Sequence, residues 1–315
     1  MENKLTILCG LPSSGKSTYA ESIKDIFDYV IISSDAIREE ISFYEDQSKN
    51  AEVFQILHQR VDEALGDGKN VIVDATNINV KSRRPLIELG KKHGAVISAI
   101  VFVTPLGTCY LSDVDRPHPV GRDVIGKMLR KFECPFYEEG FDNICFRLSH
   151  DYSDYDLSLI RRSEFSKIDK QMENFDQYNP HHKYTLGVHC KMVYDKFIEK
   201  VKNGDINIED IDSYGNFNGV KYHDIGKLHT RKFDEDGIAH YYNHENLGAY
   251  YYLSSLYCSS EWEGEVSAVN NAFIINYHMR PFGWKTDKAI ERAKKLFGEE
   301  KFHLLEEFNK IDNEF

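Results

Sequence analysis

The 315-residue sequence contains no long apolar run and has fewer basic than acidic residues. No stretch approaches the roughly 18 consecutive apolar residues that a membrane-spanning helix needs. The first four residues, Met1 to Lys4, lack the basic and then apolar composition of a secretory signal peptide. We therefore expect a protein that has no membrane association and is located in the cytoplasm.

Paired cysteines and an excess of positive charge are also missing. The six cysteines include no C-x-x-C pair, which argues against a zinc ribbon or a thioredoxin-type site and favours reduced thiols. The 39 Lys and Arg residues are outnumbered by 51 Asp and Glu residues, so the formal net charge is −12. This balance argues against a broad nucleic-acid-binding surface, although it is compatible with a local basic groove and with a nucleic-acid end as substrate.

The sequence does contain two regions with different patterns. In the first, short β-branched runs at 5–8, 29–32, 71–73 and 95–103 alternate with helix-like segments. This alternation predicts an α/β domain with a parallel sheet covered on both faces, which we assign to residues 1–158. Later in the chain, apolar residues recur at three- and four-residue spacings, which predicts an all-α domain over residues 159–315.

A phosphate-binding motif follows the first apolar run. The segment from Gly10 to Thr18 reads GLPSSGKST and matches G-x-x-x-x-G-K-[ST] between a predicted strand and a predicted helix. In such a loop the glycines let backbone N–H groups surround a phosphate, Lys16 reaches the β and γ oxygens, and Ser17 ligates magnesium. A glycine-rich turn without ligand is the alternative. We therefore predict ATP and Mg²⁺ as cofactors, bound by Gly10, Ser13, Ser14, Gly15, Lys16, Ser17 and Thr18.

An acid and a base stand three residues apart after the second run, at Asp35 and Arg38. They come at the carboxyl end of a predicted strand, where ligands of open α/β sheets bind. On one face of a helix, Asp35 could accept a hydroxyl proton while Arg38 holds a substrate phosphate. A capping aspartate with a surface arginine is an equally good interpretation.

Two further segments could complete a phosphotransfer site. Asp74 ends the third run, where a carboxylate near magnesium is expected. Arg116 and Arg122 flank Pro117-His118-Pro119 ahead of a helix-like segment, and lid arginines of this kind stabilise charge on a transferred phosphoryl group. Each arginine could also be an ordinary surface residue.

Within about residues 4–148, these motifs resemble the polynucleotide 5′-kinase branch of the P-loop phosphotransferases. The resemblance implies that Asp35 is the general base for a 5′-hydroxyl, Arg38 binds the substrate's phosphate and Arg116 contacts ATP. Arg122 is the second lid candidate. The predicted catalytic residues are thus Lys16, Asp35, Arg38, Arg116 and Arg122. A basic groove leading to Asp35 could be lined by Arg38, Lys81, Arg83 and Arg84.

Histidines and aspartates recur through the second region, at His189, His223, Asp224, His244, His278 and Asp312. Imidazole and carboxylate ligands together suit a divalent transition metal such as manganese, iron, cobalt, nickel or zinc. One histidine on an apolar helix is usually a core residue, so the set as a whole carries the prediction.

The segment from His223 to Lys227 reads HDIGK, and with the order of the other residues it resembles the HD phosphohydrolase superfamily over about residues 176–315. The resemblance implies a first metal bound by His189, His223, Asp224 and Asp312, and a second metal bound by His244 and His278. Asp287 is the substitute for Asp312. His181 and His182 could line the pocket or lie on the surface.

A kinase and an HD phosphohydrolase in one chain are similar to the bifunctional enzymes that heal broken RNA or DNA ends. The resemblance implies phosphorylation of a 5′-hydroxyl and removal of a 2′,3′-cyclic or terminal phosphate, with RNA or DNA ends as substrates and a nucleic-acid ligase as a candidate partner. One alternative is a small-molecule or nucleoside kinase joined to an HD nucleotide phosphohydrolase. Another is a regulatory switch, against which Lys16, Asp35 and the whole metal set argue.

Overall fold

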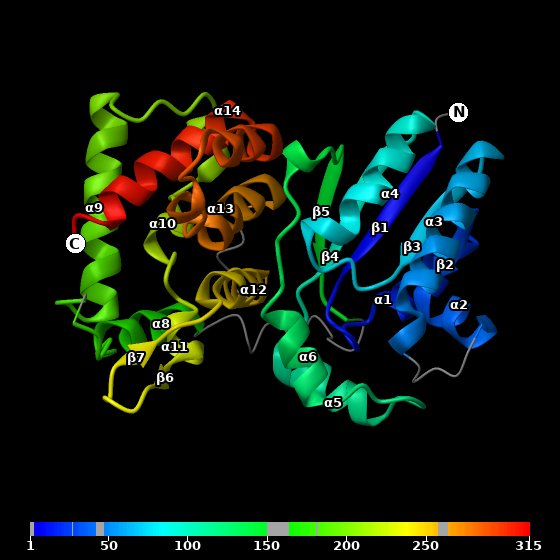
Figure 1. The fold of residues 1–315 in the computed structure, drawn as a ribbon, viewed down its shortest axis with the longest axis horizontal. Coiled ribbons are helices and arrows are strands. Elements are labelled where there is room, and N and C mark those ends of the chain that lie inside the picture. Colours follow the sequence, from blue (N-terminus) through cyan, green and yellow to red (C-terminus); the bar gives the residue numbers. More distant parts are fainter. Residues whose placement is uncertain (1–2, 27, 42–46, 150–163, 181, 258–263) are drawn as a thin grey trace. The chain divides into compact units, whose positions relative to one another are not determined.

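The computed structural model describes residues 3–26, 28–41, 47–149, 164–180, 182–257 and 264–315, which belong to two compact units (Figure 1). The first unit comprises residues 1–128 and 135–153, and the second comprises residues 129–134 and 154–315. The predicted domain boundary at residues 158 and 159 lies outside the described residues and stays a prediction.

The first unit is built on a five-stranded parallel sheet of order β2-β3-β1-β4-β5. Its strands are β1 (Lys4–Gly10), β2 (Tyr29–Ser33), β3 (Asn70–Asp74), β4 (Val96–Phe102) and β5 (Asn143–Arg147). The four apolar runs of the sequence therefore form strands, as predicted. Sequence analysis missed β5, because its residues alternate between exposed and buried positions and give no continuous apolar run.

Helices cover both faces of this sheet (Figure 1). They are α1 (Lys16–Lys24), α2 (Ser34–Ile41), α3 (Asn50–Gly66), α4 (Val80–Lys92), α5 (Leu106–Val114) and α6 (Arg122–Leu129). Ala20 of α1 packs against Leu8, Ile72 and Phe102. Gly90 of α4 packs closely on Ile97 of β4, because a Cβ atom at Gly90 would lie 2.7 Å from the Cδ1 atom of Ile97.

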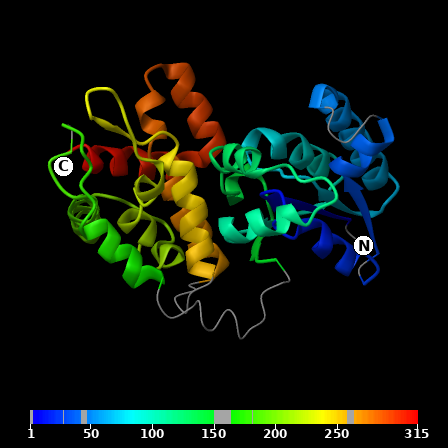
Figure 2. The same cartoon turned by 90° about the horizontal axis from the view of Figure 1, so that it is seen from below.

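The second unit is mainly helical, as predicted, with one short antiparallel hairpin. Its helices are α8 (Glu164–Glu173), α9 (Leu186–Asn203), α10 (Asn218–Lys221), α11 (Lys227–Thr230), α12 (His244–Tyr257), α13 (Glu265–Tyr277) and α14 (Asp287–Asp312). Phe197, Val220, Ile274 and Phe308 form the centre of its core. The hairpin of β6 (Lys232–Phe233) and β7 (Ala239–His240) projects from the helices (Figure 2).

One segment from the N-terminal half of the chain belongs to the second unit. Residues 129–134 follow α6 and pack on α12 and α13. The ring of Phe132 meets the ring of Tyr250 edge-on at 5.1 Å. The side chain of Asn276 accepts a hydrogen bond from the Cys134 backbone N–H at 2.6 Å and donates one to the Phe132 carbonyl at 3.1 Å. We call residues 129–134 the strap, and because of it the second unit is not continuous in sequence.

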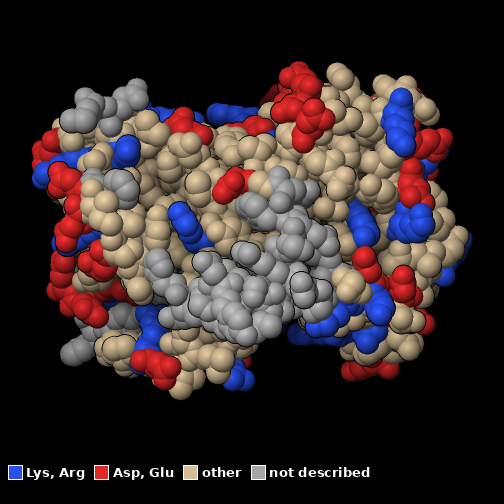
Figure 3. All heavy atoms as spheres, turned by 180° about the vertical axis from the view of Figure 1, so that it is seen from behind, with Lys and Arg blue, Asp and Glu red and all other residues tan. Residues whose placement is uncertain are grey.

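Charged side chains of both signs are present on the surface (Figure 3). On the face drawn in Figure 3, basic and acidic side chains lie in small groups among uncharged residues. None of the described helices has both the length and the hydropathy that crossing a membrane requires.

Candidate functional site

The phosphate-binding motif forms a loop between β1 and α1. Gly15 has a φ of +94°, and a Cβ atom there would lie 2.9 Å from the Cα atom of Ser149, so both the backbone angle and the packing require glycine. Helix α1 begins at Lys16 without a side-chain cap on its first turn. The backbone N–H groups of that turn therefore suit an anion.

Lys16 is buried, and its side chain turns back over the loop. The Nζ atom donates to the Leu11 carbonyl at 2.6 Å and lies 3.3 Å from the Ser14 hydroxyl. Burial lowers the pKa of the Lys16 ammonium, and the Asp74 carboxylate opposes that shift. The one buried cation of the loop is thus at the position where the motif predicts phosphate oxygens.

Asp74 ends β3 beside this loop, in register with Ser33 of β2. It is buried, and burial raises the pKa of its carboxyl, whereas Lys16 and a hydrogen bond from Ser17 lower it. Magnesium prefers oxygen ligands and binds commonly through one or two protein groups. The Ser17 hydroxyl and the Asp74 carboxylate therefore fit such an ion.

Asp35 and Arg116 meet beside the loop. Asp35 lies in the first turn of α2 with 52% of its side chain exposed, and its Oδ2 atom is 3.4 Å from the Nη2 atom of Arg116. The Nη1 atom of Arg116 lies 3.5 Å from the hydroxyl of Ser13 in the loop. The structure therefore brings an acid, a lid arginine and the phosphate-binding loop together.

The other two predicted arginines have different surroundings. Arg38 is buried, and its guanidinium donates to the Asn50 side chain of α3 at 2.6 Å. Arg122, the first residue of α6, lies over the ring of Tyr110 at 5.3 Å. Of the two lid candidates, Arg116 contacts the phosphate-binding loop.

Arg83 is not a wall of a basic groove, and that prediction is wrong. Its side chain is fully buried, forms an ion pair of 2.6 Å with Glu139, and donates to the Asn77 carbonyl at 3.1 Å. On α4, helical periodicity turns Lys81 and Arg84 outward to exposed positions while Arg83 faces the core. A run of basic residues in a sequence does not separate these orientations.

Sequence analysis missed Asp113. This buried carboxylate at the end of α5 accepts a hydrogen bond from Ser13 at 3.0 Å and two from the backbone N–H groups of Val120 and Gly121 at 3.2 and 2.8 Å. It therefore ties the phosphate-binding loop to the turn before α6 and orders the segment that carries Arg116. No motif marks it, since many helices end in an aspartate.

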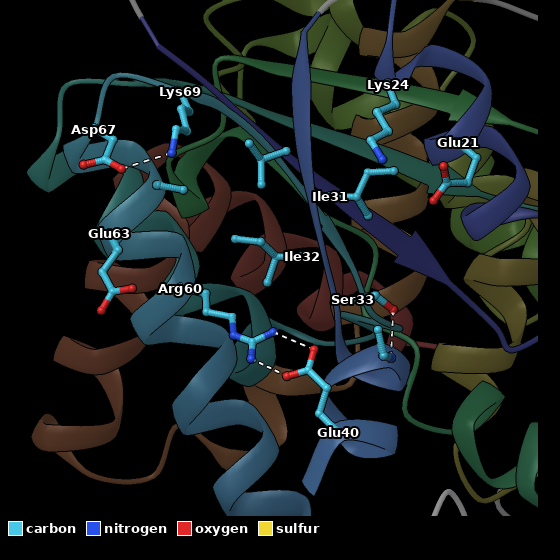
Figure 4. A pocket seen from close by; sticks show the side chains of 13 residues that line it. Glu21, Lys24, Ile31, Ile32, Ser33, Glu40, Arg60, Glu63, Asp67 and Lys69 are labelled. Carbon is cyan, nitrogen blue, oxygen red and sulfur yellow. Dashed lines mark hydrogen bonds and ion pairs between the residues drawn. The ribbon is translucent and has the colours of Figure 1, made fainter.

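A separate pocket of about 460 Å³ lies along the edge strand β2 (Figure 4). Charged side chains beside it pair with each other, as Arg60 does with Glu40 and Lys69 does with Asp67. It is not lined by any residue of the phosphate-binding loop or by Asp35. We therefore do not include it in the candidate site.

All six predicted metal ligands converge in the second unit. They come from α9, from the turn between α10 and α11, and from the ends of α12, α13 and α14. The six residues form two groups of three, and within each group the candidate ligand atoms lie within 4.8 Å of one another. The first group is His189, His223 and Asp312, and the second is Asp224, His244 and His278.

Asp224 lies between the two groups. Its Oδ2 atom is 3.7 Å from the Nε2 atom of His189 and 3.5 Å from that of His223. Its Oδ1 atom is 3.0 Å from the Nε2 atom of His244 and 3.6 Å from that of His278. One carboxylate therefore faces both groups, an arrangement with which a protein can bridge two metal ions.

Backbone carbonyls orient three of the imidazoles. The Nδ1 atoms of the three lie 2.8 to 2.9 Å from carbonyl oxygens; the pairs are His223 with Val220, His244 with Tyr241, and His278 with Ile275. A carbonyl oxygen only accepts, so Nδ1 donates, and in a neutral ring Nε2 then carries a lone pair.

The positions of these Nε2 atoms indicate whether a metal ion fits the cluster. The Nε2 atoms of His244 and His278 are 3.1 Å apart, and the buried Nε2 atom of His223 lies 3.2 Å from the Oδ1 atom of Asp312. Two lone pairs that face each other in a buried site repel unless a cation lies between them. The donor set therefore fits divalent transition metal ions.

A lysine and two further side chains adjoin this cluster. The Nζ atom of Lys227 lies 2.6 Å from the Oδ2 atom of Asp224, donates to Gln177 at 3.0 Å and is 3.4 Å from the Nε2 atom of His182. Burial alone would raise the pKa of Asp224, but Lys227 and His223 hold it well below its usual range. Cys190 also lies within ligand range of His223 and Asp224, which sequence analysis did not suggest.

Asp312 rather than Asp287 lies in the cluster. Its Oδ1 atom is 3.1 Å from the Nε2 atom of His189 and 3.2 Å from that of His223. Asp287 is at the opposite end of α14. His181 lies outside the described residues, whereas His182 is half-buried beside Lys227, and burial, aided by Lys227, lowers its pKa to about 4.

Comparison with known proteins concerns the first unit. Residues 5–135 match the family model described as an AAA domain. The L-seryl-tRNA(Sec) kinase of Methanococcus maripaludis is 30% identical over 144 residues, which are 44% of this chain and 56% of that protein. Transcription factor bHLH140 of Arabidopsis thaliana is 29% identical over 162 residues, 49% of this chain and 16% of that protein. The chain thus spans at most about half the length of these curated relatives.

Among solved structures, a chain from the Pnkp1/Rnl/Hen1 RNA repair complex is 27% identical, with a TM-score of 0.36, and the match covers 40% of this chain and 43% of that one. The family match, the kinase relative and the geometry of the phosphate-binding loop all indicate a P-loop kinase fold for the N-terminal unit. That unit is a P-loop kinase domain.

Proposed function

We propose that this protein is a bifunctional enzyme that phosphorylates a 5′-hydroxyl end of RNA or DNA and removes a 2′,3′-cyclic or terminal phosphate in a second, metal-dependent site. The observation that carries the proposal is the presence in one chain of an acid beside a phosphate-binding loop and of a buried His and Asp cluster. Each arrangement suits one half of the chemistry.

In the kinase site, Asp35 accepts the proton of the acceptor's hydroxyl group while the oxygen of that hydroxyl forms a bond to the γ-phosphorus of ATP. The bond between that phosphorus and the β–γ bridging oxygen breaks, and ADP leaves with the electron pair. Lys16 and Arg116 hold the phosphoryl oxygens and offset their negative charge. Ser17, with Asp74 nearby, would hold magnesium, which would offset the negative charge of the β and γ phosphates.

The acceptor class rests on the resemblance to polynucleotide 5′-kinases and on one relative. The L-seryl-tRNA(Sec) kinase, by its name, acts on a group attached to an RNA. An identity of 30% over 144 residues to that kinase supports an acceptor hydroxyl on a substrate that contains a nucleic acid. Arg38, one turn along α2 from Asp35, would contact the phosphate next to that hydroxyl.

In the second site, His189, His223, Asp224 and Asp312 would hold one metal ion, and His244 and His278 with Asp224 a second. Bound metal supplies an activated water and polarises the phosphoryl oxygens. The protein's own groups orient the imidazoles through their Nδ1 atoms, exclude bulk water by burial, and place Lys227 where it can pair with a substrate phosphate oxygen.

A small-molecule or nucleoside kinase is the second candidate, and two observations favour it. The Arg38 guanidinium is bound to Asn50, and Arg83 is buried in an ion pair with Glu139. Two of the four side chains predicted to line a basic groove therefore bind other side chains of the protein, which leaves less positive charge for a phosphate backbone.

The deciding experiment follows γ-phosphate transfer from ATP to a panel of acceptors. The panel contains 5′-hydroxyl RNA and DNA oligonucleotides, nucleoside 3′-phosphates and plain nucleosides. We expect oligonucleotides and 3′-phosphates to be better acceptors by roughly ten- to a hundredfold, the equivalent of one charge-assisted contact. Arg38→Ala should remove most of that preference, with Arg122→Ala as the matched control. Equal use of plain nucleosides, unchanged by Arg38→Ala, would establish the small-molecule kinase.

A further inference from the structure

Three large aromatic side chains of the second unit are more than half exposed near the β6–β7 hairpin. The exposed fractions are 54% for Tyr178, 55% for Phe233 and 67% for Tyr242. The rings of Tyr178 and Phe233 meet edge-on at 5.7 Å. We call Tyr178, Phe233 and Tyr242 the aromatic rim. Exposed apolar side chains that gather in one place mark a binding surface more often than scattered ones do.

An exposed arginine lies among these rings. The guanidinium carbon of Arg231 is 4.4 Å from the ring centre of Phe175 and 5.5 Å from those of Tyr178 and Phe233. Its Nη1 atom donates to the Asp176 carbonyl at 3.1 Å, which fixes the plane of the guanidinium. Aromatic faces beside an arginine plane are the groups on which proteins stack unpaired nucleobases.

The backbone at Tyr178 is held in an unfavourable conformation. Its φ is +43°, a left-handed value that a bulky residue rarely adopts. Two hydrogen bonds keep it there, from its N–H to Asp176 at 2.9 Å and from the Ala239 N–H to its carbonyl at 2.8 Å. Strain of this kind is typically retained at ligand-binding positions, and here it holds a tyrosine ring at the surface.

The rim adjoins the metal cluster through a short chain of contacts. Gln177, the residue before Tyr178, accepts a hydrogen bond from Lys227 at 3.0 Å, and Lys227 lies 2.6 Å from Asp224. The hydroxyl of Tyr241, the residue before Tyr242, donates to the Gln177 carbonyl at 2.6 Å. Two residues of the rim are therefore direct sequence neighbours of the side chains that surround Lys227.

Charge along the hairpin indicates where a phosphate backbone can pass. Arg231 and Lys232 lie at its base, whereas Asp234, Glu235 and Asp236 lie toward its turn, and all five are exposed. A nucleic-acid strand is attracted to the base and repelled from the turn. The strand would thus cross the base of the hairpin, beside the rim.

We propose that the aromatic rim and Arg231 form a stacking platform for the unpaired bases next to the 3′ end of a single-stranded nucleic acid whose terminal phosphate enters the metal cluster. The inference rests on the proposed phosphoesterase function, whose substrate it restricts to a strand with bases to stack. Stacking is tolerant of sequence, so the platform predicts little base preference.

The test measures binding and hydrolysis by the full chain loaded with Mn²⁺, in a Lys16→Ala background that removes phosphate transfer. The probe is a short fluorescent single strand that ends in a 2′,3′-cyclic phosphate, compared with the same strand whose last nucleotides are abasic. Phe233→Ala and Tyr242→Ala should each weaken binding of the intact strand about 5- to 150-fold and leave the abasic strand unaffected. Phe282→Ala, which removes another exposed ring of the second unit, should have no effect.

Tyr178→Gly separates a binding role from a structural one. Glycine adopts a φ of +43° without strain, so this variant should unfold at the parental temperature or above it and still lose affinity for the intact strand. Tyr178→Phe, which keeps the ring, should retain parental affinity. A rise in KM for the cyclic-phosphate strand, with kcat on p-nitrophenyl phosphate unchanged, is the expected kinetic pattern.

The outcomes distinguish this inference from the function on which it rests. Weaker binding in the rim variants, with no hydrolysis by any metal-loaded protein, would support the platform and reject the phosphoesterase. Normal hydrolysis with identical affinities in parent and rim variants would reject the platform and leave the phosphoesterase standing. A change only in oligomeric state would identify the rim as a contact between protein chains, which also overturns the inference.

Discussion

The two candidate centres of this protein are built in opposite ways. In the kinase domain, Asp35 is half exposed and meets Arg116 at 3.4 Å, and both lie on segments that follow strands or connect helices. In the helical unit, His223 and Asp224 are buried, and backbone carbonyls orient the histidines. The side chains of the first centre are partly open to solvent, whereas the candidate ligand atoms of the second centre already lie within 4.8 Å of one another in groups of three.

The difference fits what each centre is proposed to bind. Phosphate transfer between two large molecules needs an opening for both, so its residues lie at a sheet edge that solvent reaches. Divalent ions are small, and buried carboxylates such as Asp224 are tolerated only next to cations. We therefore expect substitutions in the metal cluster to change the metal content and stability of the protein. Substitutions in the kinase site should change only the rate of phosphate transfer.

The largest expected effect is at the metal cluster. His223→Ala and Asp312→Ala should purify with little or no bound transition metal, because each removes a ligand atom that neighbours two others within 4.8 Å. Metal analysis by mass spectrometry checks this, with Asp287→Ala as the matched control at the other end of α14. Metal content equal to the parent's in His223→Ala would contradict the assignment.

The next effect concerns phosphate transfer. Lys16→Ala and Asp35→Ala should reduce kcat by about 10² to 10⁴, the range for a lost general base or charge clamp, without loss of metal. The melting temperature and metal content of Asp35→Ala should equal those of the parent, because Asp35 is half exposed. Wild-type transfer by Asp35→Ala would remove it as the base, and a parallel loss of metal would indicate misfolding.

A smaller effect should separate the two lid arginines. Arg116→Ala should lower kcat by about 10² to 10³, since it removes one charged group from the transferred phosphoryl. Arg122→Ala should change it much less, because its guanidinium lies over Tyr110. Steady-state rates at saturating ATP decide between them. The reverse order of effects would place Arg122 at the phosphates in the closed state.

The strap should affect stability and leave both chemistries intact. Phe132→Ala removes a buried ring that packs on Tyr250, and large-to-small changes of this kind lower the free energy of unfolding by about 3 to 5 kcal/mol. Denaturant unfolding of the second unit measures it, with Phe282→Ala as the exposed control. A Phe132→Ala protein as stable as the parent would mean that the strap does not anchor this unit.

Much of the kinase site could be predicted because its residues are adjacent in sequence to strands. The strand, loop and helix around Lys16 and the acid after β2 follow from local pattern. Asp113 could not be predicted, since its role depends on hydrogen bonds to residues a hundred positions away and to a turn. The inward orientation of Arg83 likewise depends on its partner Glu139.

In the helical unit, the sequence predicted which histidines and aspartates lie together, but not how they divide into groups. The groups of three, the position of Asp224 between them and the approach of Cys190 are set by helix packing, which spacing along the chain does not encode. The strap was also missed, because nothing in residues 129–134 distinguishes them from the helix that precedes them.

The central claim is that one chain holds two separable centres for the two ends of a broken strand. Its most direct test offers the parent, Asp35→Ala and Asp224→Ala one RNA that carries both a 5′-hydroxyl and a 2′,3′-cyclic phosphate, with ATP, Mg²⁺ and Mn²⁺, and follows both ends. The account predicts that the parent converts both ends, that Asp35→Ala converts only the 3′ end, and that Asp224→Ala converts only the 5′ end. Loss of both conversions in either folded variant, or no conversion of the 3′ end by the metal-loaded parent, would contradict it.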